Sequence, residues 1–417
     1  MRLSPLIAAV LVAALLPAAA SAKPRRLSVP KAQLHASFAC DGSLKGAART
    51  PVLLVPGTGE DPDFFSWNYE PALERLGIPY CTVTLPEHGT ADIQVAAEYV
   101  VSAIRRMHAR TAHRIAVIGH SQGGMVPRWA LRFWPDTRRM VDDLVGLAAS
   151  NHGTTGARSI CAAGCSAATW QQRDDSKFIA ALNAGTETWK GISYTSVFTH
   201  DDEIVMPNQD AQTGSTALRN GAGRIANVAV QDLCHNDTSD HLQLGSSDAV
   251  GYALAIDALT HDGPADAGRV PATTCLQPAQ PGVNPATGPS DAAASYAKVA
   301  RQFGSGKVLG AEPPLKCYVT RSCAKPRRKA TARPRLRVTA TPRTLHAGRR
   351  ARVRVRVRRA DGHAVRGARV RLGGTTVRTG RHGRAVLRVR FAHTGRRALK
   401  VRKAGFATRT MRVRVRA

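Results

Sequence analysis

The stretch Ile115-Ala-Val-Ile-Gly-His-Ser121-Gln-Gly-Gly124 decides the fold of this chain. Its apolar run Ile115–Ile118 predicts a buried strand, and the apolar periodicity of Met125–Phe133 predicts a helix. The turn between them has the pattern G-x-S-x-G. Small flanking residues allow a very sharp turn, which exposes the serine oxygen at the positive end of the helix. The stretch therefore predicts Ser121 as a nucleophile.

Similar apolar runs and helical stretches alternate on both sides of this turn. This alternation is typical of a parallel sheet covered by helices, an α/β fold. The expected strands are Val52–Val55, Cys81–Leu85, Leu144–Ala148, Tyr194–Phe198 and Ile225–Val230. The expected helices are Asp92–Met107, Asp248–Leu259 and Asp291–Phe303.

A serine nucleophile needs a histidine base, and the base needs a carboxylate that orients it. In this kind of fold the chain order is serine, then aspartate or glutamate, then histidine. The loop after strand Tyr194–Phe198 contains Asp201 and Asp202. We expect Asp202 to orient the base, with Asp201 as the alternative.

Three histidines follow the last expected strand: His235, His241 and His261. His261 lies beyond a helix, and His235 adjoins Cys234, whose expected disulfide would restrain it. His241 lies in the loop between the strand and the helix, where the triad histidine belongs. We therefore expect His241 to be the base.

The negatively charged oxygen of the tetrahedral intermediate needs hydrogen-bond donors. One is the backbone N–H after the nucleophile, at Gln122, and the other comes from the loop after an early strand. That loop reads Val55-Pro-Gly-Thr-Gly59, in which Thr58 offers an N–H and a hydroxyl. This chemistry requires no metal and no organic cofactor.

Several segments together resemble the Candida antarctica lipase B group of secreted triacylglycerol lipases. They are Val52-Leu-Leu-Val-Pro-Gly-Thr-Gly59, Asp92-Ile-Gln-Val-Ala-Ala-Glu-Tyr-Val100, Ser121-Gln-Gly-Gly124, Trp170-Gln-Gln172 and Asp202-Glu-Ile-Val205. The resemblance covers about residues 36–323 and implies an α/β-hydrolase fold. It implies Ser121, Asp202 and His241 as the triad and Thr58 and Gln122 as the oxyanion donors.

The same resemblance implies further residues of the site. It places Gln172 and Ile204 in the wall that binds the acyl chain. His120 occupies the position of a tryptophan that lines the alcohol pocket of the yeast lipase, and we expect His120 to contact substrate. The resemblance also implies three disulfide pairs: Cys40–Cys81, Cys234–Cys275 and Cys317–Cys323.

The N-terminus and the cysteines indicate export. Residues 1–22 combine Arg2, an apolar run and the cleavage pattern Ala20-Ser21-Ala22, which is typical of a secretory signal peptide. Eight cysteines follow, and an even number in an exported chain indicates disulfides. Cys161 and Cys165 have no counterpart in the lipase pattern, and their spacing favours a local disulfide.

The charge of the chain is concentrated at its C-terminal end. Residues 324–417 contain 32 of the 60 Lys and Arg residues but only one of the 29 Asp and Glu residues. Residues 324–334 have the composition of a linker. Residues 335–417 alternate Arg with Val or Leu between turn signals, which predicts a small immunoglobulin-like β-sandwich.

This distribution excludes a uniformly basic nucleic-acid binder. It also excludes an integral membrane protein, because no long apolar run follows the N-terminus. An anionic cell-envelope polymer or lipid surface is the expected partner of the basic domain, with a plain spacer as the alternative. Nucleic acid would bind there without sequence preference.

The sequence thus predicts a secreted serine hydrolase: a triacylglycerol lipase or carboxylesterase that acts on a lipid or ester substrate. A polyester depolymerase, an acyltransferase and a non-catalytic surface-binding protein are the alternatives.

Overall fold

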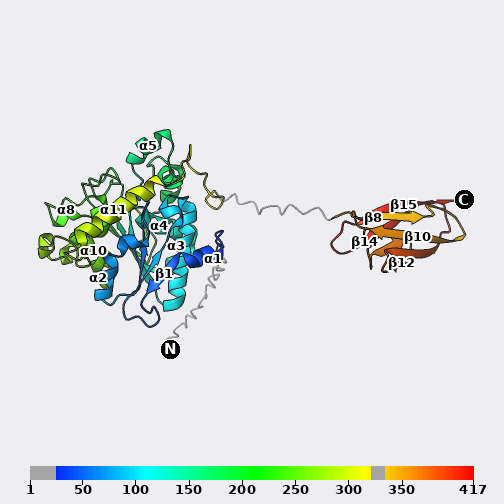
Figure 1. Ribbon diagram of the computed structural model, residues 1–417, viewed down its shortest axis with the longest axis horizontal. Coiled ribbons are helices and arrows are strands. Elements are labelled where there is room, and N and C mark those ends of the chain that lie inside the picture. Colours follow the sequence, from blue (N-terminus) through cyan, green and yellow to red (C-terminus); the bar gives the residue numbers. More distant parts are fainter. Residues whose placement is uncertain (1–24, 321–333) are drawn as a thin grey trace, which may run out of the picture. The chain divides into compact units, whose positions relative to one another are not determined.

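The computed structural model describes residues 25–320 and 334–417 (Figure 1). The chain forms two compact units, Met1–Ser322 and Cys323–Ala417, called the first and second unit below. The expected signal peptide and all but the last residue of the expected linker lie outside the described residues. Within the described ranges, no helix is long and apolar enough to cross a membrane.

A seven-stranded sheet forms the centre of the first unit. Its strand order is β1-β3-β2-β4-β5-β6-β7, and every neighbouring pair is parallel except β1 with β3. The strands are β1 (Phe38–Asp41), β2 (Val52–Val55), β3 (Tyr80–Val83), β4 (Ile115–His120), β5 (Val141–Leu147), β6 (Ser193–Phe198) and β7 (Arg224–Ala229). This arrangement confirms the predicted α/β sheet, and it adds the edge strand β1, which the sequence analysis missed.

Helices cover both faces of this sheet. Figure 1 shows α3 and α4 on one side and α2 and α10 on the other. The helices are α1 (Lys31–Ala36), α2 (Tyr69–Arg75), α3 (Ile93–Thr111), α4 (Gln122–Phe133), α5 (Gly156–Ile160), α6 (Ala167–Gln171), α7 (Lys177–Asn183), α8 (Val230–Leu233), α9 (His241–Ser246), α10 (Ala249–Thr260) and α11 (Gly288–Gly304).

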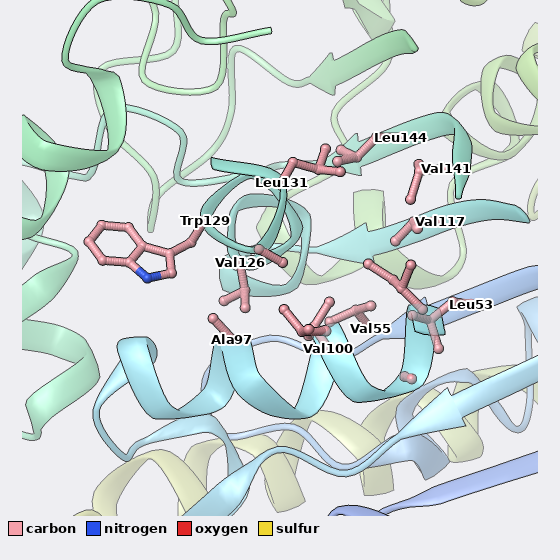
Figure 2. Close-up of a cluster of buried hydrophobic side chains, with 14 of the residues drawn as sticks. Leu53, Val55, Ala97, Val100, Val117, Val126, Trp129, Leu131, Val141 and Leu144 are labelled. Atoms are coloured by element: carbon pink, nitrogen blue, oxygen red, sulfur yellow. The ribbon is translucent and has the colours of Figure 1, made fainter. Parts of the chain in front are cut away.

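The central strands are apolar throughout because each face of the sheet has its own core. Side chains alternate along a strand. Leu53 and Val117 pack with α3 and α4 in the cluster shown in Figure 2, while Leu54 and Ile118 belong to the cluster on the opposite face. Burial on both faces explains why these strands are continuous apolar runs.

The second unit consists of two sheets around one core, and all their strand pairs are antiparallel except β15 with β9. One sheet has the order β13-β10-β8 and the other β12-β11-β14-β15-β9. The strands are β8 (Arg337–Thr341), β9 (Thr344–His346), β10 (Arg350–Arg358), β11 (Arg369–Leu372), β12 (Thr375–Arg378), β13 (Arg384–Arg390), β14 (Gly395–Arg402) and β15 (Arg409–Arg416). Aliphatic side chains of both sheets form a single buried cluster, as expected of a β-sandwich. The immunoglobulin-like topology stays a prediction.

Among the described residues of the first unit, three disulfides are Cys40–Cys81, Cys161–Cys165 and Cys234–Cys275. Cys40 and Cys81 stand directly opposite each other on β1 and β3. This bond therefore fastens the short edge strand to the sheet. The pair Cys317–Cys323 stays a prediction, because Cys323 lies outside the described residues.

The Cys40–Cys81 bond is expected to stabilise the first unit more than the Cys161–Cys165 bond does. The two bonds join residues 41 and 4 positions apart. Loss of chain entropy in the unfolded state is worth about 4 kcal/mol for the long loop and about 2 kcal/mol for the short one. The double variants C40A/C81A and C161A/C165A should lower the free energy of unfolding by these amounts.

Urea denaturation followed by tryptophan fluorescence measures this difference. All five tryptophans precede residue 190, so the signal reports on the first unit. An equal loss of stability in the two double variants would contradict the prediction.

Candidate active site

Ser121 stands on a strained turn between β4 and α4. Its backbone has φ 54° and ψ −126°, a conformation that costs about 1–3 kcal/mol for a residue with a side chain. A Cβ on Gly119 would lie 2.1 Å from the carbonyl oxygen of Gly123, and a Cβ on Gly123 would lie 2.1 Å from that of Val55. Both flanking positions therefore have to be glycine for the turn to form.

His241 and Asp202 form a buried pair beside this turn. The Nδ1 atom of His241 lies 3.0 Å and 3.1 Å from the two carboxylate oxygens of Asp202. His241 lines the same cavity as Ser121. The alternatives Asp201, His235 and His261 are exposed.

His241 is the first residue of α9, whereas the sequence analysis placed it in a loop. Asp240 caps this helix, because its side chain accepts a hydrogen bond from the backbone N–H of Gln243. The cap fixes where the helix begins and thereby fixes the backbone that carries the imidazole.

The carboxylate of Asp202 is held by its own loop. Its Oδ1 accepts hydrogen bonds from the backbone N–H groups of Ile204 (3.0 Å) and Val205 (2.7 Å). Asn208 donates to its Oδ2 at 3.5 Å. The sequence analysis missed Asn208, which has no motif to mark it. These bonds orient the carboxylate towards the imidazole.

The surroundings of His241 raise its pKa above the usual value of 6.5. Burial alone would lower this pKa, because the charged imidazolium loses hydration. The Asp202 carboxylate beside it, with smaller contributions from Glu60 and Glu203, outweighs that effect. The arrangement therefore stabilises a protonated His241.

Thr58, Gln122 and Gln172 form a hydrogen-bonded group next to Ser121. The Thr58 hydroxyl donates to Oε1 of Gln122 at 3.3 Å and accepts from Nε2 of Gln172 at 2.8 Å. Ser150 donates to Oε1 of Gln172 at 2.9 Å. The structure thus brings together both predicted oxyanion donors and one predicted wall residue.

Ser121 opens into a cavity of about 360 Å³ whose wall is largely apolar. Ile204 lies in this wall and is 49% exposed. Apolar side chains from α5, α9 and α11 complete the wall: Ala157, Ile160, Leu242, Val299, Ala300 and Phe303. In residues 25–320 and 334–417, no group of three or more His, Cys, Asp or Glu side chains is arranged to hold a metal ion.

The structure places His120 in the interior beside the cavity. Its side chain is completely buried, and it does not line the cavity. Its Nδ1 lies 2.6 Å from a carboxylate oxygen of Glu60, and its Nε2 lies 2.9 Å from the backbone carbonyl oxygen of His241. The expected contact of His120 with substrate stays a prediction.

Comparison with known proteins agrees with this geometry. Residues 97–243 match the family model "Lipase (class 2)", and this segment contains Ser121, Asp202 and His241. The chain is 36% identical over 212 residues to lipase B of Pseudozyma antarctica. That alignment covers 50% of this chain and 60% of the relative. The chain thus spans less than two thirds of the length of this curated relative.

The crystal structure of Aspergillus fumigatus lipase B has the same fold as the first unit. The match has a TM-score of 0.66 at 27% identity and covers 73% of this chain and 75% of the other. The first unit is thus similar to the class 2 lipases over residues 97–243, and it has the α/β-hydrolase fold of a fungal lipase B.

Proposed function

We propose that the protein is a secreted serine hydrolase that cleaves carboxylic esters, with triacylglycerols as its substrates. One observation carries this proposal: Ser121 and the His241–Asp202 pair meet at one apolar cavity. A nucleophile, a base and an oriented carboxylate are the groups that acyl transfer requires.

In the proposed reaction, His241 removes the proton of Ser121 as the serine oxygen attacks the ester carbonyl. Asp202 holds the imidazole so that Nε2 faces the serine, and it stabilises the imidazolium that forms. The backbone N–H groups of Gln122 and Thr58 stabilise the oxyanion. His241 then protonates the leaving alcohol, and water attacks the acyl-enzyme in the same way.

The apolar wall of the cavity favours an acyl chain as the part of the substrate that binds there. Apolar side chains of α5, α9 and α11 favour burial of methylene groups, each worth about 0.8 kcal/mol. A polyester depolymerase and an acyltransferase would form the same acyl-enzyme and differ in the group that accepts or leaves. Both similar proteins are lipases by name, which favours a lipase here.

Export is supported by the N-terminal pattern of residues 1–22 and by the disulfides. Disulfides form and persist in oxidising compartments. Three of them occur among the residues that the structure describes.

We further propose that the second unit binds anionic surfaces of the cell envelope. This second proposal rests on a set of cross-strand arginine pairs on the exposed face of β10 and β13. We call this set the arginine ladder: Arg350 opposite Arg390, Arg352 opposite Arg388, and Arg356 opposite Arg384.

Like charges directly opposite each other on a sheet destabilise it. The single acidic residue of residues 324–417 is Asp361, and it pairs with Arg359 and His363. The second unit therefore has no carboxylate of its own for the arginine ladder. Phosphate or carboxylate groups of a partner would relieve the repulsion.

Replacement of Ser121 by alanine should abolish ester hydrolysis and leave the fold intact, because only the nucleophile is removed. Asp202→Ala and His241→Ala should each lower kcat by about 10⁴-fold. The variant that carries both substitutions should have a kcat no lower than that of the less active single variant. Hydrolysis of a soluble ester measures these losses. Labelling by a fluorophosphonate and peptide mapping should find Ser121 modified, and modification of another serine would overturn the assignment.

The pH dependence of kcat/KM should show the raised pKa of His241. The base must be neutral to accept a proton, so activity should fall as the pH drops through a pKa above 6.5. In Asp202→Asn the main contribution that opposes burial is lost and only the smaller ones of Glu60 and Glu203 remain, so the pKa of His241 should fall and the acid limb of the residual activity should move to lower pH. An acid limb that does not move in this variant would contradict the assignment of Asp202.

Neutralising part of the arginine ladder should release the protein from anionic vesicles. The full-length variant R352Q/R356Q/R388Q should bind vesicles containing phosphatidylglycerol about 100-fold more weakly, since each of the three cations removed contributes about 1 kcal/mol near such a surface. The control R49Q/R139Q/R301Q changes the net charge equally on exposed residues of the first unit. If both variants bind the vesicles equally weakly, only the net charge matters, and the arginine ladder is not a binding site. Hydrolysis of a soluble ester should be unchanged in both.

A further inference from the structure

Glu60 and His120 form a buried ionisable pair next to the proposed triad. Their side chains are 1% and 0% exposed, and Oε1 of Glu60 lies 2.6 Å from Nδ1 of His120. Burying such groups is costly unless every polar atom has a partner. The proposed reaction uses neither Glu60 nor His120, so the cost of burying them needs another explanation.

The proton positions of this pair follow from its partners. Nε2 of His120 lies 2.9 Å from the backbone carbonyl oxygen of His241, and a carbonyl oxygen only accepts. Nε2 therefore carries a proton and donates it. Two acceptors would repel each other at 2.6 Å, so a second proton lies between Nδ1 and the carboxylate of Glu60. The pair thus presents a fixed N–H donor to His241.

Packing holds the ring of His120 in this orientation. Phe64, in a short helical turn at Pro62–Phe65, stacks on the ring with centroids 5.0 Å apart and planes 8° apart. Gly245 of α9 lies on the ring, since a Cβ there would come within 2.1 Å of its Cδ2. The ring therefore fills a slot between this turn and the helix that begins at His241.

The pair also reaches the loop that carries Thr58. Oε2 of Glu60 accepts a hydrogen bond from the backbone N–H of Gly57 at 2.5 Å. His120 itself immediately precedes Ser121. Three backbone segments thus meet at this pair: the Thr58 loop, the serine turn and the start of α9. The backbone N–H of His241 is held separately by Glu203 at 3.1 Å.

We infer that Glu60 and His120 are positioning residues for ester hydrolysis, which fix His241 and the Thr58 loop relative to Ser121. The inference rests on the proposed triad. Displacing a reacting group by about 1 Å can cost about 100-fold in rate, so a rigid link between these segments has a direct kinetic value. The link acts through the backbone atoms of Gly57 and His241.

Two variants separate positioning from simple stability. In Glu60→Gln, the amide oxygen still accepts from Gly57 and the amide N–H donates to Nδ1 of neutral His120, so both bonds remain. In the double variant E60L/H120F, apolar side chains of similar size replace the pair. Such replacements of buried ion pairs are often neutral or stabilising, so this variant is expected to fold.

The measurements are kcat and KM for a soluble ester, the melting temperature, and the rate at which a fluorophosphonate labels Ser121. We expect E60Q to keep kcat within about 3-fold, and the folded double variant to lose about 100-fold in kcat with KM within about 2-fold. The labelling rate should fall in parallel with kcat.

Two results would overturn the inference: a folded double variant with nearly normal kcat, or an E60Q variant that loses as much as the double variant. If the double variant does not fold, the kcat of E60Q can still overturn the inference. Wild-type protein that is not labelled at Ser121 would refute the proposed function instead, so the two failures are distinguishable.

Discussion

The first unit depends on a backbone contact that only glycine permits. Gly123, at the start of α4, lies against the carbonyl oxygen of Val55 at the end of β2, and Gly119 lies against Gly123 itself. This contact brings the serine turn up to the loop that carries Thr58. The strained backbone of Ser121 persists because β4 and α4 are buried on all sides, so their packing offsets about 1–3 kcal/mol of strain. A side chain at either glycine would push the turn that carries Ser121 away from its present position beside Val55 and the Thr58 loop.

The sequence predicted the interior of the first unit better than its edge. Strands such as β2 and β4 are buried on both faces, so they appear as continuous apolar runs. Strand β1 has four residues, of which only Phe38 is fully buried, and its partner β3 lies about forty positions further along the chain. No local pattern distinguishes such a strand from a loop. Its position depends on pairing and on the Cys40–Cys81 bond.

The placement of Ser121 and His241 at one cavity, with Asp202 beside His241, was predictable because a fixed chain order and a fixed topology accompany the serine turn. The interior position of His120 was not predictable, because the resemblance to the yeast lipase implied a place in the alcohol pocket, whereas the side chain is completely buried. Its partner Glu60 is sixty positions away, and Asn208 supports Asp202 from a loop without a motif. Contacts of this kind follow from tertiary packing, which spacing along the chain does not encode.

The distribution of charge suits the proposed reaction. Glu60 and Glu203 line the cavity together with Ser121 and His241. Ester hydrolysis converts a neutral substrate into a carboxylate product, and like charges a few ångströms apart repel strongly where water is excluded. The same cavity that accepts a neutral ester by apolar contact therefore disfavours the anion that it produces. Arginine at this site would reverse the effect and retain the product. The excess of basic over acidic residues lies instead in residues 324–417, outside the unit that contains the cavity.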